Sequence, residues 1–111
     1  MIVSLAKIEC QNIFDWPSFH SEFMRVFGFP DFYGKNMDAW IDCMSSLNAP
    51  EDRMTSIHCE EGKQITIELD GGSSLKERCP EIFNSINECC AFVNWRLIQS
   101  NGFPVLALAY D

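Results

Sequence analysis

Three short apolar segments alternate with long stretches of helical periodicity, and this order limits the fold more than any other feature of the chain. The apolar segments are residues 1–8, 64–69 and 104–111, and the second is rich in β-branched side chains. Strands that are separated by helices pair in parallel through right-handed crossovers. The sequence therefore predicts one α/β domain over residues 1–111, with a small parallel sheet of about three strands packed against helices. The first and last segments show no polar alternation, so we expect both strands to be buried on both faces.

Three helical regions separate these strands. The first begins after Asp15, a suitable N-cap that is followed by Pro17 in the first turn, and it ends at Gly28. The second covers about residues 36–47, and the third runs from 74 to 102. Each region carries apolar side chains at helical spacing, which predicts that one face of each helix packs on the sheet.

Two local patterns refine this outline in the second half of the chain. Ser74 and Glu77 have the spacing of a capping box, and Pro80 is expected to start a new helix. Apolar side chains after Pro80 recur at i, i+3 and i+4, which predicts one buried stripe. The stripe consists of Ile82, Phe83, Ile86, Cys90, Val93 and Leu97. Residues 54–59 have the composition of a further strand, which a turn would join to the strand at 64–69 as an additional hairpin.

The charge balance narrows the class of partner. Sixteen Asp and Glu side chains outnumber 8 Lys and Arg side chains, for a net charge of -8. Such a chain gains nothing from the phosphates of nucleic acid, and the anionic surface of a membrane repels it. We therefore expect no direct contact with nucleic acid or membrane, and a basic protein as the partner. Residues 1–10 lack the basic segment with which a secretory leader begins, so we expect a cytoplasmic protein.

The six cysteines are dispersed through predicted helices and strands, which is unlike a disulfide framework. No C-x-x-C pair occurs, and the two histidines lie far from any paired cysteines. We therefore expect neither a metal site nor a cofactor, and we interpret the cysteines as reduced core thiols. Cys89 and Cys90 are adjacent, and on a helix their side chains point about 100° apart, which leaves their role open.

Residues 29–44, FPDFYGKNMDAWIDCM, differ from the rest because Pro, Gly and aromatic residues precede a helix with two acids. On a helical wheel of about 100° per residue, Asp38, Asp42 and Ser45 share one side. A separate arc predicts the core face and contains Met37, Trp40, Ile41, Met44 and Leu47. Like charges at i and i+4 cost a helix roughly a few tenths of a kcal/mol. Spacing alone is compatible with a solvated polar face and with a surface that binds a basic partner.

The same segment resembles the signature of the barstar family of ribonuclease inhibitors. From Phe32 to Cys43 it reads aromatic, Tyr, Gly, any residue, Asn, apolar, Asp, Ala, two apolar residues, Asp and Cys. The match is strongest over about 16 residues, and this chain is longer around residues 48–63 and in its final helix. The resemblance implies a small parallel sheet packed with helices. It also implies an inhibitor or immunity protein that blocks the active site of a basic ribonuclease toxin.

In that family, carboxylates of the inhibitor take the place of RNA phosphate among the cations of the enzyme. Asp42 matches the principal acid of the family, and Asp38 matches the second acid one helical turn earlier. Phe32 occupies an aromatic contact position, although the hydroxyl that the family carries there is absent. Ser45 shares the side of the helix that carries the acids. The resemblance implies that all four side chains contact the partner.

Four further positions complete the implied contact set. Tyr33 and Gly34 match the family directly, and Gly34 is expected where the chain turns sharply into the helix. Asn36 matches a polar position at the helix start, where it also suits an N-cap. Ile41 stands where the family has Trp. Trp40 is one position earlier, which rotates the large ring about 100° toward the core.

The interface acid that the family carries on its last helix has no counterpart. The equivalent region reads AFVNWRLIQS, in which Arg96 has the opposite charge, and Glu88 lies too early in the chain. The two central acids of the family's interface, Asp38 and Asp42, are kept, while the acid at its periphery is missing. This difference implies a diverged partner.

Two other classes of function stay open. An interaction module of the same fold would use the acidic helix to bind another basic protein, such as a DNase, a tRNA-cleaving toxin or a regulatory partner. An enzyme would need Asp38 and Asp42 as an acid and base, or His20 or His58 as a base beside a neighbouring Cys as nucleophile, and His58 is directly followed by Cys59. Adjacent strand residues point to opposite faces, and no phosphate-binding glycine motif occurs, so we expect no catalytic activity.

Overall fold

A parallel sheet of three strands in the order β1-β2-β3 forms the centre of the protein, which a computed structural model describes over residues 1–111. The strands are β1 (Leu5–Glu9), β2 (Ile65–Asp70) and β3 (Leu106–Tyr110). Each neighbouring pair is parallel, so that Ala6 lies opposite Ile67 and Ile67 lies opposite Leu108. The predicted α/β fold with a small parallel sheet is confirmed.

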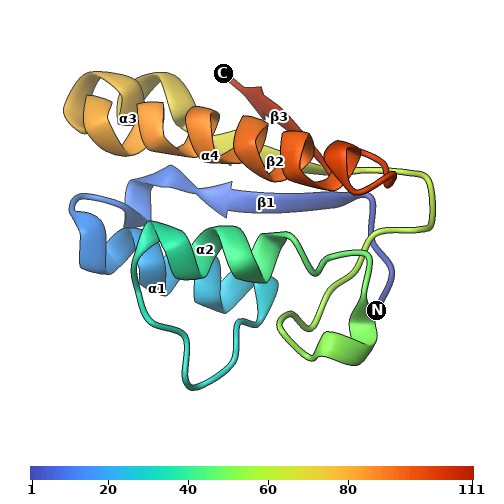
Figure 1. The fold of residues 1–111 in the computed structure, drawn as a ribbon. Coiled ribbons are helices and arrows are strands. Elements are labelled where there is room, and N and C mark those ends of the chain that lie inside the picture. Colours follow the sequence, from blue (N-terminus) through green and yellow to red (C-terminus); the bar gives the residue numbers. More distant parts are fainter.

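Helices form both crossovers. α1 (Trp16–Phe27) and α2 (Met37–Met44) connect β1 to β2, while α3 (Gly72–Arg78) and α4 (Pro80–Gln99) connect β2 to β3. In Figure 1, α4 runs alongside β2 and β3, and α1 and α2 lie together on the other side of β1. All of these helices contribute to one core of 25 buried residues, which includes Phe23, Trp40 and Ile86. None of the helices combines the length and the apolar content that a membrane span requires.

The prediction that the first and last strands are buried on both faces is wrong. Burial alternates along β1, where Ala6 and Ile8 are buried while Leu5 and Lys7 are exposed. β1 and β3 are the two edge strands, and the helices cover only one face of the sheet. The opposite face carries side chains that are exposed or partly exposed: Leu5, Lys7, Glu9, Thr66, Glu68, Asp70, Ala107 and Ala109. Apolar composition alone did not show that one face of the sheet stays uncovered.

The ends of α1 follow the sequence closely. Asp15 is the N-cap: its side chain accepts a hydrogen bond from the backbone N–H of Ser18, and the Ser18 hydroxyl oxygen accepts one from the backbone N–H of Asp15. Gly28 ends the helix with a left-handed backbone, at φ 68°. A Cβ atom at Gly28 would overlap the side chain of Ser56, so this position needs glycine for space as well as for conformation.

The predicted capping box at Ser74 and Glu77 does not form. α3 begins two residues earlier, and Gly71 is its N-cap. The Asp111 carboxylate accepts hydrogen bonds from the backbone N–H groups of Gly71 and Gly72, at 2.8 and 3.0 Å. A carboxylate that is distant in sequence therefore does what a local capping residue was expected to do.

Pro80 does start a new helix, α4, as predicted. The apolar stripe along α4 is buried at Ile82, Phe83, Ile86, Cys90 and Val93, and partly buried at Leu97. Asn94, the residue after Val93, connects α4 to the start of β3 through its side chain. Its side-chain oxygen accepts hydrogen bonds from the backbone N–H groups of Val105 and Leu106, both at 3.0 Å, and its amide N–H donates to the Leu106 carbonyl at 2.9 Å. The Asn94 side chain therefore satisfies hydrogen-bonding groups of the backbone at the start of β3.

The predicted hairpin strand at residues 54–59 is also wrong. His58 makes a single parallel bridge with Ile2, through hydrogen bonds that include Val3 N–H to His58 O at 2.9 Å. Further along the same segment, the backbone N–H of Ser56 donates to Phe27 O at 2.9 Å. These backbone groups are bound to the N-terminal residues and to the end of α1, so they are not free to form a hairpin with β2.

Candidate functional site

The acidic helix α2 starts at a side-chain cap. Asn36 is the N-cap, and its side-chain oxygen accepts a hydrogen bond from the backbone N–H of Ala39 at 2.8 Å, as predicted. The left-handed residue before the helix is Lys35, at φ 54°, and not the expected Gly34. A Cβ atom at Gly34 would lie 3.3 Å from the Asn36 amide nitrogen, so Gly34 provides space for the cap. Lys35 therefore makes the turn into the helix that was expected at Gly34, and Gly34 leaves room for the cap.

The two faces of α2 are separated as the helical wheel predicted. Trp40 and Met44 are buried, and Ile41 is partly buried at the margin of this face. Asp38 and Asp42 are exposed on the outer face. Ser45 is partly buried beside them, and its hydroxyl donates to the carbonyl oxygen of Ile41 at 2.7 Å. Two carboxylates one helical turn apart are thus presented to solvent on a helix that the core holds in place.

The loop before α2 presents one aromatic ring and buries the next. The Phe32 side chain is 76% exposed, whereas Tyr33 is buried. The Tyr33 hydroxyl lies 2.5 Å from Nδ1 of His20, a residue of α1 that is itself only 3% exposed. Burial, together with the charge of Lys35, lowers the pKa of His20. The hydrogen bond between the neutral imidazole and the Tyr33 hydroxyl ties the loop to α1.

Sequence reasoning missed His20 as part of this arrangement. The residue follows Trp16 by one helical turn, and their rings are 6.1 Å apart and nearly parallel. Its i, i+4 spacing from Trp16 was the available signal, because it places the imidazole on the face of α1 that packs inward.

A small hollow of about 200 Å³ lies between this loop and the outer face of α2. Phe32 lines it from the loop and Asp42 lines it from α2, and both are residues that the sequence analysis expects to contact a partner. Met54 lines it from the segment that precedes β2. The remaining lining residues are Pro30, Tyr33, Gly34, Ala39 and Cys43. The contribution of Met54 was not predicted, because nothing in the local pattern of residues 48–57 indicates that the segment folds back beside the loop.

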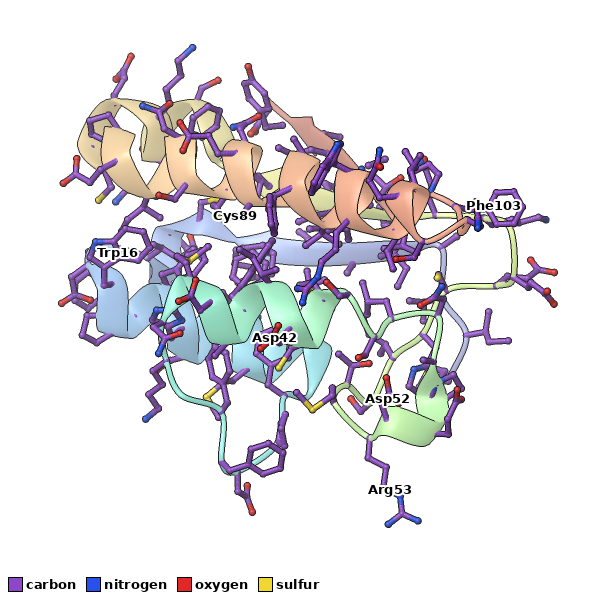
Figure 2. The ribbon with its side chains drawn as sticks, in the orientation of Figure 1. Trp16, Asp42, Asp52, Arg53, Cys89 and Phe103 are labelled. Atoms are coloured by element: carbon purple, nitrogen blue, oxygen red, sulfur yellow. The ribbon has the colours of Figure 1, made fainter.

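One cation lies against the principal acid. Nη1 of Arg96, on α4, lies 3.2 Å from Oδ1 of Asp42, and the two side chains are 47% and 60% exposed. Figure 2 shows Asp42 on α2, facing the helix α4 above it. From the sequence, Arg96 was noted only because its charge is opposite to that of the acid that the family carries on its last helix. The structure shows that this arginine is the direct neighbour of Asp42.

Burial disfavours ionisation of the two thiols near the site. Burial, together with the charge of Asp42, raises the pKa of Cys43 to about 11. Burial also raises the pKa of Cys89, where Glu88 and Asp38 add to the effect. All six cysteines are unpaired, and no group of three or more His, Cys, Asp or Glu side chains is arranged to hold a metal ion. The chemistry of this surface is therefore that of exposed carboxylates and an aromatic ring.

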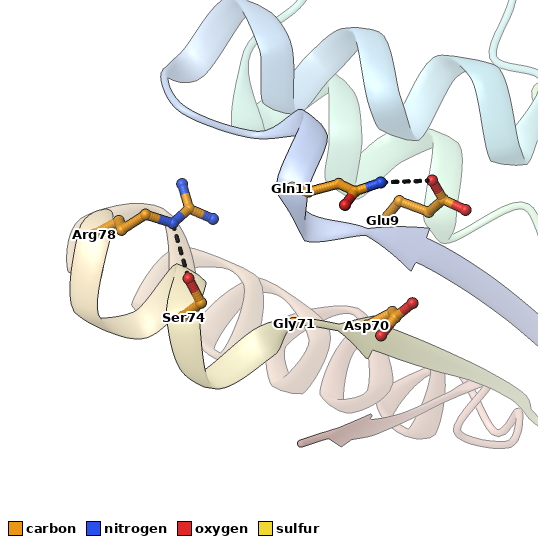
Figure 3. Close-up of a pocket in the computed structure, with 6 residues that line it drawn as sticks. All are labelled: Glu9, Gln11, Asp70, Gly71, Ser74 and Arg78. Carbon is orange, nitrogen blue, oxygen red and sulfur yellow. Dashed lines mark hydrogen bonds between the residues drawn. The ribbon is translucent and has the colours of Figure 1, made fainter.

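A separate polar groove of about 430 Å³ lies at the carboxyl ends of β1 and β2. Its lining residues, drawn in Figure 3, are Glu9, Gln11, Asp70, Gly71, Ser74 and Arg78. The Arg78 guanidinium donates to the carbonyl oxygens of Ile13 and Cys10, at 2.8 and 3.1 Å, and to the Ser74 hydroxyl at 3.0 Å. Arg78 thus joins α3 to the segment that follows β1.

The fold and the acidic surface together define a small α/β protein that presents carboxylates on a helix next to an exposed aromatic loop. The family model described as Barstar (barnase inhibitor) matches residues 3–108. The chain therefore belongs to the Barstar family. No curated protein sequence matches the chain.

Proposed function

We propose that this protein inhibits a basic ribonuclease by inserting the acidic face of α2 and the loop before it into the active site of the enzyme. The observation that carries the proposal is the joint exposure of Asp38, Asp42 and Phe32 in a chain that belongs to the Barstar family. Asp42 and Phe32 line one hollow, and Asp38 lies one helical turn before Asp42. An enzyme that cleaves RNA places Arg, Lys and His side chains where the phosphate binds. Carboxylates on a helix satisfy the same cations through charge-assisted hydrogen bonds.

The shape of the surface supports this arrangement. The hollow between Phe32, Met54 and Asp42 combines an apolar wall with one carboxylate. A flat side chain of the enzyme, such as an imidazole, fits such a wall and pairs with such a carboxylate. Ile41 and Ser45, which are partly buried beside Asp42, complete the contact surface.

The remaining members of the implied contact set act mainly on the shape of the loop. Tyr33 is fixed to His20, Asn36 caps α2, and Gly34 leaves room for that cap. Their backbones and exposed edges reach the partner, while their side chains hold Phe32 and the acids in position. The loop therefore arrives at the enzyme already ordered, which lowers the entropic cost of binding.

The biological role that follows is immunity. We propose that the protein neutralises a ribonuclease toxin in the cytoplasm of the cell that makes it. Its net charge of -8 favours rapid encounter with a basic enzyme.

The test is inhibition of RNA cleavage by barnase and by further basic ribonucleases, titrated with this protein. We expect activity to fall to zero at one-to-one stoichiometry. Asp42→Ala is expected to weaken binding by about 2–5 kcal/mol, because it leaves a buried cation of the enzyme without a partner. Glu61→Gln, which removes one exposed charge from the turn before β2, is the matched control and should bind as the wild type does.

Two results would contradict the proposal. If Asp42→Ala inhibits as well as the wild type does, the acidic helix is not the binding surface. If the protein inhibits no ribonuclease but captures a different basic protein through Asp38 and Asp42, the surface is correct and its partner is of another class.

A further inference from the structure

The ion pair between Arg96 and Asp42 carries an inference about the partner that rests on the function proposed above. Its two side chains come from α4 and α2, and their charged atoms are 3.2 Å apart. An ion pair that is this exposed contributes little to folding stability. Its importance lies in what happens when a partner covers Asp42.

The Arg96 guanidinium is largely unused in the free protein. Its bond to Asp42 is its only side-chain hydrogen bond within the chain, although a guanidinium has five N–H donors. The Arg96 side chain as a whole is 47% exposed, so solvent reaches it. Arg25 and Arg78, by contrast, each make two or more hydrogen bonds within the chain.

A partner that buries Asp42 must also bury Arg96. At 3.2 Å from the carboxylate, the guanidinium lies inside any contact that excludes water from Asp42. A buried guanidinium with unpaired donors is costly, and enzyme cations around it would add repulsion. A tight complex therefore needs an acceptor on the partner that is placed for Arg96.

We propose that Arg96 is a specificity-determining contact residue that pairs with a carboxylate of the target enzyme. A carboxylate matches the planar fork of a guanidinium and can accept two parallel hydrogen bonds from it. A carboxylate beside the phosphate-binding cations can serve as the general base of RNA cleavage, so such an acceptor is compatible with the chemistry of the enzyme. The recognised site is thus mixed in charge, with cations for Asp42 and an acid for Arg96.

The experiment compares inhibition constants for Arg96→Gln, Arg96→Glu and Asp42→Asn against barnase and further basic ribonucleases. Lys7→Gln is the matched control, because Lys7 forms an ion pair of similar exposure with Asp70, at 3.3 Å, on the open face of the sheet. We expect Arg96→Gln to weaken inhibition at least tenfold, Arg96→Glu to weaken it further, and Lys7→Gln to leave it unchanged. Thermal denaturation of each variant shows that the fold is retained.

The outcomes separate this inference from the proposed function. If Asp42→Asn loses inhibition while Arg96→Gln keeps or gains it, Arg96 only shields Asp42, and the inference is overturned while the proposed function stands. If neither substitution changes inhibition, or if no basic ribonuclease is inhibited by any form of the protein, both proposals fail.

Discussion

Glu22 is a single buried side chain that joins α1 to the end of β1 and the residues after it. Its carboxylate is 4% exposed and accepts hydrogen bonds from the backbone N–H of Glu9 at 2.9 Å and from the Asn12 amide at 3.2 Å. Arg25 pairs with both carboxylate oxygens, at 3.1 and 2.7 Å. Burial raises the pKa of Glu22, but these hydrogen bonds outweigh it, and the net pKa lies below the ordinary value of 4.5.

A pH dependence of stability follows from Glu22. Because its pKa is lowered in the folded state, its contribution is fully present above pH 4.5 and is lost as the pH falls through the lower folded value. We expect Glu22→Gln to cost about 1–3 kcal/mol at neutral pH, and the deficit to shrink as the solution is acidified. Urea denaturation of both forms between neutral and acidic pH measures this. A deficit that stays constant with pH would show that the lost contribution is packing and not charge.

The residues whose structural position was predicted correctly are those whose position depends on local sequence. Asn36 caps the helix three residues ahead of it, and Asp38 and Asp42 lie on one face because of helical spacing. Arg96 lies 54 residues from Asp42 in the chain, and the contact depends on how α4 is positioned against α2. Nothing in a local pattern specifies that distance.

The helix α2 depends on its cap more than a longer helix would. It has 8 residues, and helices this short are marginal without packing and capping. We expect Asn36→Ala to lower the stability of the protein by about 1 kcal/mol, because the N–H of Ala39 loses its acceptor. Asn36→Asp, which keeps an acceptor oxygen at the same place, should retain most of that stability.

Denaturation and inhibition measured on the same variants check this prediction. Equal stability of Asn36→Ala and wild type would show that the bond to Ala39 contributes nothing. Equal inhibition despite lower stability would show that packing alone orders the acidic face of α2.

At the scale of elements, helices were predicted better than strands. The helical spacing of apolar residues identified both long helices, and their faces follow from it. Whether helices cover one or both faces of a sheet depends on contacts between distant segments, which a local pattern does not specify. That is why β1 was expected to be buried on both faces, and why residues 54–59 were expected to form a strand.

At the scale of the whole molecule, the order of strands and helices was sufficient to predict a parallel sheet. Parallel pairing requires a crossover between strands, and the helical stretches of this chain provide two. The restriction of the helices to one face of the sheet was not predictable from that order. The helices lie on one face because their buried side chains form one common core with that face of the sheet.

The charge of the molecule predicts how fast the complex with a basic ribonuclease forms. With a net charge of -8, association should slow by about tenfold or more between low and high salt, because ions screen the attraction. Dissociation should change much less. Stopped-flow measurement of both rates with an inhibited ribonuclease tests this, and an association rate independent of salt would show that charge does not guide the encounter.

The position of Asn94 also matters while the chain is being synthesised. The ribosome makes the chain from its N-terminus, so Asn94 leaves it before Val105 and Leu106 do. An exposed strand edge invites pairing with neighbouring nascent chains. When the first backbone groups of β3 emerge, the side chain that pairs with them is already present in the same polypeptide. Asn94 thereby covers the first backbone groups of β3, while the rest of that edge and the edge of β1 stay open.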